Sequence, residues 1–186
     1  IDTSRIGVWG MSTGGTTALQ AGGARIDFKA LNEWCAANEA ERYGESCQFI
    51  GQESSTAALY GVADPFAQPL PPISDSRVAA IVLASPGGEL QVFGAAGIAA
   101  VKLPTLIMVS SDDTMVKPEF NALWAYDGIG SEDKTLAVFD KGGHALFVGL
   151  GPHVEQVRTL TIAFFLHILM GDAAAKAAVL PDAVSF

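Results

Sequence analysis

The chain has 186 residues, of which 49% are hydrophobic and 17% are charged. This length and composition favour one folded domain with a substantial core and argue against a disordered protein. The formal net charge of −9 repels phosphate backbones and anionic membranes, so nucleic-acid binding is not expected. No apolar run reaches the roughly 18 to 20 residues that a membrane-spanning helix needs.

Short apolar runs with few charges alternate along the chain with segments that suit helices. Buried strands are predicted at residues 5–10, 77–84, 105–110 and 134–139. Helices are predicted at residues 16–21, 118–126 and 152–170, with a short further helix at 173–178. Apolar strands that alternate with helices indicate an α/β fold, with a mostly parallel sheet covered by helices on both faces.

Residues 27–75 interrupt this alternation, and we interpret them as an insertion within a single domain that spans residues 1–186. The segment contains one predicted helix, at residues 28–40, and the only two cysteines, Cys35 and Cys47. No histidine lies near the cysteines to complete a metal site, which leaves a local disulfide or two free thiols. A disulfide would indicate an oxidising compartment, either the periplasm or the exterior of the cell.

Residues 10–14 read Gly-Met-Ser-Thr-Gly and match the pattern G-x-S-x-G. A predicted strand precedes the motif and a predicted helix follows it, as in the sharp turn that exposes a nucleophilic serine. Glycines are expected on both sides of Ser12 because the turn leaves no room for side chains there. The amide of Thr13, at the start of the helix, would then bind a developing oxyanion. The alternative is a turn whose serine only caps the helix.

A serine hydroxyl needs a base within hydrogen-bonding reach. The chain contains three histidines that could be this base. His144 follows a predicted strand and two glycines, in a turn that can bring its imidazole to Ser12. His153 is expected to be a solvated helix cap, and His167 lies in an apolar helix. We therefore predict that His144 is the general base.

The acid that orients the base is expected between the serine and the histidine in the chain. Asp112 and Asp113 both follow the third predicted strand, and Glu89, after the second strand, is a weaker candidate. Spacing alone does not separate the two aspartates. Because neighbouring carboxylates repel, the one that is not used should face solvent or cap a turn.

Three stretches resemble the α/β-hydrolase superfamily, namely residues 7–15, 106–121 and 142–144. The sequence is most similar to predicted dienelactone hydrolases and to platelet-activating-factor acetylhydrolase-like esterases, with further similarity at residues 93–97. The resemblance places the catalytic acid on Asp113, through the segment Pro118-Glu119-Phe120-Asn121. It also favours a disulfide between Cys35 and Cys47 and an exported enzyme.

The chain departs from that family in two respects. Met11 stands where relatives often have histidine, which alters the wall of the site. The first predicted strand is also the strand that leads to the serine, whereas in the superfamily several strands precede it and an upstream loop supplies a second oxyanion amide. Because an open edge there would be an aggregation hazard, we expect an N-terminal polypeptide segment to complete the sheet.

The residues and the resemblance together predict a serine hydrolase that cleaves a small-molecule carboxylic ester, with Ser12, Asp113 and His144 as its triad. A peptidase or amide hydrolase would use the same triad and remains an alternative. A second alternative is a non-catalytic binding protein that retains the fold. No metal or organic cofactor is implied by this chemistry.

Overall fold

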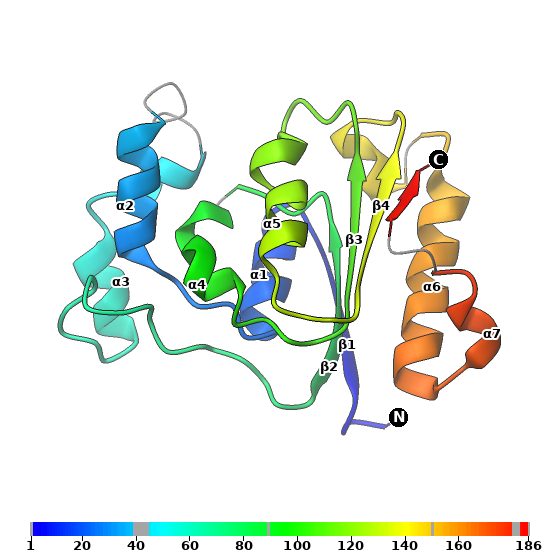
Figure 1. Ribbon diagram of the computed structural model, residues 1–186, viewed down its shortest axis with the longest axis horizontal. Coiled ribbons are helices and arrows are strands. Elements are labelled where there is room, and N and C mark those ends of the chain that lie inside the picture. Colours follow the sequence, from blue (N-terminus) through cyan, green and yellow to red (C-terminus); the bar gives the residue numbers. More distant parts are fainter. Residues whose placement is uncertain (1, 39–44, 89, 150, 180–182, 186) are drawn as a thin grey trace.

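The computed structural model describes residues 2–38, 45–88, 90–149, 151–179 and 183–185. Within these ranges, five parallel strands form one sheet in the order β1-β2-β3-β4-β5. The strands are β1 (Ile6–Met11), β2 (Val78–Ala84), β3 (Thr105–Ser110), β4 (Lys134–Phe139) and β5 (Ala183–Ser185). The fold is therefore α/β, and the carboxyl ends of all five strands lie at the same edge of the sheet, which is uppermost in Figure 1.

Helices cover both faces of the sheet, as the alternating pattern predicts. The α-helices are α1 (Thr13–Ala21), α2 (Phe28–Ala37), α3 (Glu53–Leu59), α4 (Gly94–Ile98), α5 (Ala122–Gly128), α6 (Val154–Met170) and α7 (Ala173–Lys176). The 3₁₀ helices are η2 (Glu45–Phe49), η3 (Leu90–Phe93), η4 (Pro118–Phe120) and η5 (His144–Val148). Figure 1 shows α1, α4 and α5 on one face of the sheet and α6 and α7 on the other.

The side chains of the strands alternate between two buried clusters, one on each face of the sheet. In β2, for example, Ile81 and Leu83 pack in the cluster beneath α1 and α5, whereas Ala80, Val82 and Ala84 pack toward α6. Small residues on the α6 side allow that long helix to lie close to the sheet. Burial on both faces explains why β2 and β3 read as continuous apolar runs rather than as alternating ones.

The helix expected at residues 118–126 forms as two elements, because the chain is interrupted at Asn121. The backbone of Asn121 has φ −125° and ψ −88°, outside the helical region. Its side-chain amide donates a hydrogen bond to the carbonyl of Lys117 at 3.1 Å. A local bond from an asparagine side chain to the backbone competes in this way with helix continuation.

The insertion packs on the outer side of the layer that contains α4. Its helix α2 contacts η3 and α4, and its apolar side chains Phe28, Leu31 and Leu70 belong to the same buried cluster as the neighbouring face of the sheet. The helix expected to reach residue 40 ends at Ala37, and residues 39–44 lie outside the described ranges. The insertion therefore extends the core of the domain.

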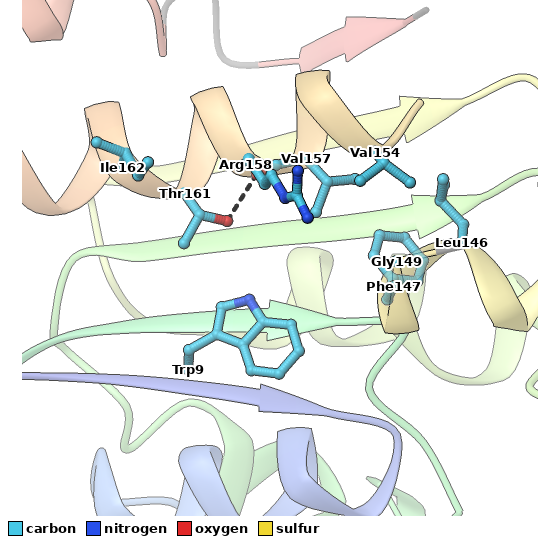
Figure 2. Close-up of a pocket in the computed structure, with 9 residues that line it drawn as sticks. All are labelled: Trp9, Leu146, Phe147, Gly149, Val154, Val157, Arg158, Thr161 and Ile162. Atoms are coloured by element: carbon cyan, nitrogen blue, oxygen red, sulfur yellow. Dashed lines mark hydrogen bonds between the residues drawn. The ribbon is translucent and has the colours of Figure 1, made fainter. Parts of the chain in front are cut away.

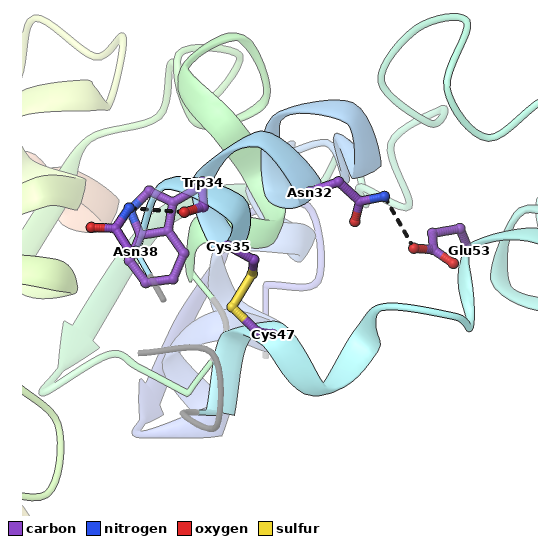
Figure 3. Close-up of a disulfide and its surroundings, with 6 residues drawn as sticks. All are labelled: Asn32, Trp34, Cys35, Asn38, Cys47 and Glu53. Carbon is purple, nitrogen blue, oxygen red and sulfur yellow. Dashed lines mark hydrogen bonds between the residues drawn. A yellow bond between two sulfur atoms is a disulfide. The ribbon is translucent and has the colours of Figure 1, made fainter. Parts of the chain in front are cut away.

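A disulfide joins Cys35 of α2 to Cys47 of η2, with 5.8 Å between the Cα atoms (Figure 3). This confirms the paired reading of the two cysteines, and both are buried. The side-chain amide of Asn32 donates to the buried carboxylate of Glu53 at 3.3 Å, which links α2 to α3. The disulfide and this hydrogen bond therefore both tie α2 to the segment that follows it in the insertion.

None of the helices in the described residues combines the length and the apolar character that crossing a membrane requires.

Candidate active site

Ser12 lies between β1 and α1, in a backbone conformation that residues other than glycine rarely adopt. Its φ is 53° and its ψ is −125°, and its side chain makes no capping hydrogen bond to α1. Ser12 thus occupies the N-cap position, but the alternative that its side chain serves only to cap the helix is wrong. Its amide donates to the carbonyl of Ala84 at 3.0 Å, and its carbonyl accepts from the amide of Gly15 at 2.8 Å. Backbone hydrogen bonds hold Ser12 in this strained turn. Among the described residues, its hydroxyl makes no hydrogen bond.

The structure requires glycine at two positions near Ser12, and only one of them is a glycine of the G-x-S-x-G pattern. A Cβ on Gly10 would lie 2.0 Å from the carbonyl oxygen of Gly14, and a Cβ on Gly15 would lie 2.7 Å from Cβ of Pro86. A Cβ on Gly14 would meet nothing within 4 Å. The prediction of crowding on both sides of the serine is thus correct for Gly10 and wrong for Gly14, where the turn opens to solvent. The crowded glycine after Ser12 is Gly15.

Thr13 is the first residue of α1, and it is exposed. The amides of the first turn of a helix have no acceptor within that helix. They also lie at the positive end of the helix dipole. The Thr13 amide is therefore available to an anionic group that forms next to Ser12.

Asp113 and His144 come from the ends of β3 and β4 and are joined by a hydrogen bond. Nδ1 of His144 donates to Oδ2 of Asp113 over 2.8 Å. The Asp113 side chain is fully buried and that of His144 is 13% exposed. The glycines that precede the histidine, Gly142 and Gly143, have φ of 133° and 56°, which explains why the turn requires them.

The carboxylate of Asp113 accepts four hydrogen bonds from the described residues. Oδ1 accepts from the amides of Met115 and Val116 at 3.0 and 2.9 Å. Oδ2 accepts from His144 and, at 2.6 Å, from the hydroxyl of Ser85. These four bonds satisfy the buried carboxylate and hold it in one orientation.

Asp112 is exposed, and no hydrogen bond joins it to the imidazole among the described residues. Its Oδ1 accepts from the hydroxyl of Ser110 at 2.6 Å and from the amide of Gly143 at 2.8 Å. These two bonds hold the pKa of the Asp112 carboxyl below its usual value. The structure therefore pairs His144 with Asp113, while Asp112 faces solvent and fastens the turn that precedes the histidine. Glu89 lies outside the described residues.

The other two histidines lie in or next to α6. His153 occupies the N-cap position but makes no capping hydrogen bond, and its ring lies 5.5 Å from that of Phe139. The expectation of a solvated cap is wrong, because the ring is half-buried against the aromatic side chain. His167 is half-buried in α6.

Ser12 and the Asp113–His144 pair lie at the same edge of the sheet, past the ends of β1, β3 and β4. Among the described residues, no hydrogen bond joins the hydroxyl of Ser12 to the imidazole. In enzymes without bound substrate, such bonds are often long and tighten only when the substrate binds. The structure thus brings His144 and Asp113 into contact, and within the described ranges the hydroxyl of Ser12 has no hydrogen-bond partner.

Ser85 is the residue of this region that the sequence reading missed. It follows β2 directly, is fully buried and has a φ of 39°. Its only sequence signal is its place at the end of an apolar strand, next to Pro86 and Gly87. All four strand ends from β1 to β4 therefore contribute a polar side chain to this edge.

An apolar cavity of about 260 Å³ lies between β1 and α6 (Figure 2). Trp9 forms one wall, Val157 and Ile162 of α6 form the opposite wall, and Leu146 and Phe147 of η5 close one end. Ser12, Asp113 and His144 are not among its lining residues. The cavity is therefore next to the loop that carries His144 but separate from the polar cluster.

No group of three or more histidine, cysteine, aspartate or glutamate side chains within the described ranges is arranged to hold a metal ion. The sequence matches no known family model, and it has no significant match among curated proteins. The fold and the geometry of the site are consequently the basis for assigning a function.

Proposed function

We propose that the protein is a serine hydrolase that cleaves carboxylic esters through an acyl-enzyme on Ser12. The observation that carries the proposal is the 2.8 Å hydrogen bond between the buried Asp113 and His144, at the sheet edge where Ser12 stands in a strained turn. A carboxylate on Nδ1 fixes the imidazole tautomer that leaves Nε2 free to accept a proton. The placement of the three groups at the ends of parallel strands supports the same function.

In the proposed reaction, His144 takes the proton of Ser12 as the hydroxyl attacks the ester carbonyl. The tetrahedral oxyanion is stabilised by the amide of Thr13. His144 then protonates the leaving alcohol and, in the second half of the reaction, activates a water that hydrolyses the acyl-enzyme. Asp113 keeps its hydrogen bond to Nδ1 and stabilises the imidazolium that forms twice in each cycle.

A fluorophosphonate probe tests this proposal directly, since it reacts only with an activated serine. The purified protein should be labelled on Ser12, as located by mass spectrometry of its peptides, and should hydrolyse a short-chain aryl ester. Ser12→Ala should lose both the label and the turnover. Thr17→Ala, which removes an exposed hydroxyl bonded within α1, is the matched control. Labelling that persists in Ser12→Ala, or a wild-type protein that the probe does not modify, would refute the proposal.

We further propose that the chain is the C-terminal part of an α/β-hydrolase domain and that an N-terminal polypeptide segment completes its sheet along β1. In the described residues β1 pairs only with β2, so that its other side has free hydrogen-bonding groups. Trp9 is 42% exposed beside this edge. Ile162, Leu166 and Met170 form an exposed apolar stripe on α6. A strand along β1 with a covering element over Trp9 would bury both features.

Intact-mass analysis of the active protein tests the proposed segment. The active species should contain polypeptide beyond the 19.3 kDa of this chain, either as one longer chain or as a second chain. An active esterase of 19.3 kDa with no other component would contradict it.

We propose a periplasmic or secreted location, on the basis of the buried disulfide. Protein isolated from its own cells without reductant, and alkylated at once under denaturing conditions, should have no modified cysteine. Alkylation of both Cys35 and Cys47 would place the protein in a reducing compartment.

A further inference from the structure

Ser85 combines three features that no other residue of the site has together. It is fully buried, it has a left-handed φ of 39° although it is not glycine, and its hydroxyl donates a 2.6 Å hydrogen bond to Oδ2 of Asp113. Glycine would adopt this backbone without strain. Strained positions of this kind persist when the surrounding structure and the function require the side chain.

The hydroxyl of Ser85 and the imidazole of His144 share one oxygen of Asp113. The other carboxylate oxygen is fixed by the amides of Met115 and Val116. Together, the two amides and the hydroxyl determine both the plane and the rotation of the carboxylate. The direction in which Oδ2 faces the imidazole therefore depends on Ser85, the only side chain other than His144 that donates to that oxygen among the described residues.

The turn that begins at Ser85 also contacts the nucleophile loop. The amide of Gly87 donates to the carbonyl of Ser12 at 3.3 Å, and the hydroxyl of Thr16 donates to the carbonyl of Gly87 at 2.9 Å. Pro86 packs against Gly15 closely enough to exclude a Cβ there. One short turn thus touches the backbone of Ser12 on one side and the carboxylate of Asp113 on the other.

We infer that Ser85 is a positioning residue, which sets the orientation of Asp113 and, through it, of the His144 ring toward Ser12. The inference rests on the proposed serine hydrolase function. It adds to the site a residue that follows β2, beside the three that follow β1, β3 and β4. Ser85 does not exchange a proton with the substrate. Its hydroxyl keeps the carboxylate aligned when the imidazolium forms, a step that occurs only during turnover.

Two variants separate the hydroxyl from the backbone strain. Ser85→Ala keeps a Cβ in the left-handed conformation and removes the hydroxyl, whereas Ser85→Gly removes both the hydroxyl and the strain. We expect both to lower kcat by about 10- to 100-fold, the effect of losing a hydrogen bond to a charged group, with little change in KM. Ser85→Gly should nevertheless have the higher Tm of the two.

Ser131→Ala provides the matched control. Ser131 is also buried and its hydroxyl donates to the carbonyl of Asp133 at 3.1 Å, but it precedes β4, at the opposite edge of the sheet. This variant should lower Tm and leave kcat near the wild-type value. If Ser85→Gly retains wild-type kcat while Ser85→Ala does not, strain is responsible and the inference is wrong.

A spectroscopic readout makes the test independent of turnover. The proton on Nδ1 of His144, shared with Asp113, is expected to give a low-field resonance in the proton NMR spectrum. Both Ser85 variants should shift this resonance and Ser131→Ala should leave it in place. An unmoved resonance in both Ser85 variants would overturn the inference, whether or not the wild-type protein hydrolyses esters. Absence of fluorophosphonate labelling in the wild type would overturn the proposed function instead.

Discussion

The loop that carries Ser12 and the loops that carry Asp113 and His144 lie at the same edge of one sheet, but they are held in different ways. Asp113 follows the central strand β3, is buried, and is fixed through its side chain by four hydrogen-bond donors among the described residues. Ser12 follows the edge strand and is fixed through its backbone, with a φ of 53° and no hydrogen bond on its side chain among the described residues. The acid and base are thus oriented by polar contacts, and the serine by a tight turn.

The difference predicts that the two sides of the site fail by different mechanisms. Loss of a polar group should impair Asp113 and His144 without disturbing the sheet, because their environment is already packed. Added volume should impair the Ser12 turn, because the backbone packs closely around Gly10 and Gly15. Three measurements test this contrast.

Asp113→Asn should lower kcat by roughly 10³- to 10⁴-fold, because an amide at this position favours the wrong imidazole tautomer. Asp112→Asn, at the neighbouring exposed position, should lower kcat far less. The measurement is steady-state hydrolysis of an aryl ester by both variants at one pH. A larger loss of kcat in Asp112→Asn than in Asp113→Asn would assign the acid to Asp112. It would also contradict the view that the buried Asp113 orients His144.

Gly15→Ala should destabilise the protein by about 1 to 3 kcal/mol, since its Cβ would lie 2.7 Å from Cβ of Pro86. Gly14→Ala, at the adjacent position in the same helix, meets nothing within 4 Å. It should be neutral or stabilising by up to about 1 kcal/mol, because alanine favours the helix. Urea unfolding of the two variants measures the difference, and equal free energies of unfolding would show that the turn is not tightly packed.

Asp112→Asn should have a small effect on stability that depends on pH. The folded-state pKa of Asp112 is lowered, chiefly by the hydroxyl of Ser110 and then by the amide of Gly143. The charged carboxylate therefore stabilises the fold above its ordinary pKa of 3.8, and this contribution is lost as the pH falls through the lowered value. The variant should be less stable than the wild type at about pH 7, and the difference should shrink as the pH falls below 3.8. A difference that does not change with pH would contradict this role.

Much of the sheet could be predicted from the sequence. The strands at residues 105–110 and 134–139 form with the predicted bounds, because each is a short apolar run that ends at polar or glycine residues. The strand β5, Ala183–Ser185, was missed because three residues carry no recognisable period. The interruption at Asn121 was also missed, since it depends on one side-chain hydrogen bond rather than on a pattern.

The candidate site was predictable in its members but not in its contacts. The placement of Ser12 and His144 after strands follows from the pattern of apolar runs and glycines. The choice between Asp112 and Asp113 did not follow from the residues, because adjacent positions after a strand point in different directions that only the fold determines. Ser85 was not found because a left-handed serine has no signature in the sequence, and its role depends on Asp113, 28 positions further along the chain.

The order of the strands in the sheet is the same as their order in the chain, from β1 to β5. Neighbouring strands in any sheet lie about 4.8 Å apart. The sheet therefore sets the spacing of the four polar residues at its edge. The connections between strands can change in length without altering that spacing. The long connection between β1 and β2, which contains the insertion, illustrates this, because Ser12 still meets the backbone at the end of β2. An insertion in a connection can therefore change the surroundings of the site without moving the polar residues at the strand ends.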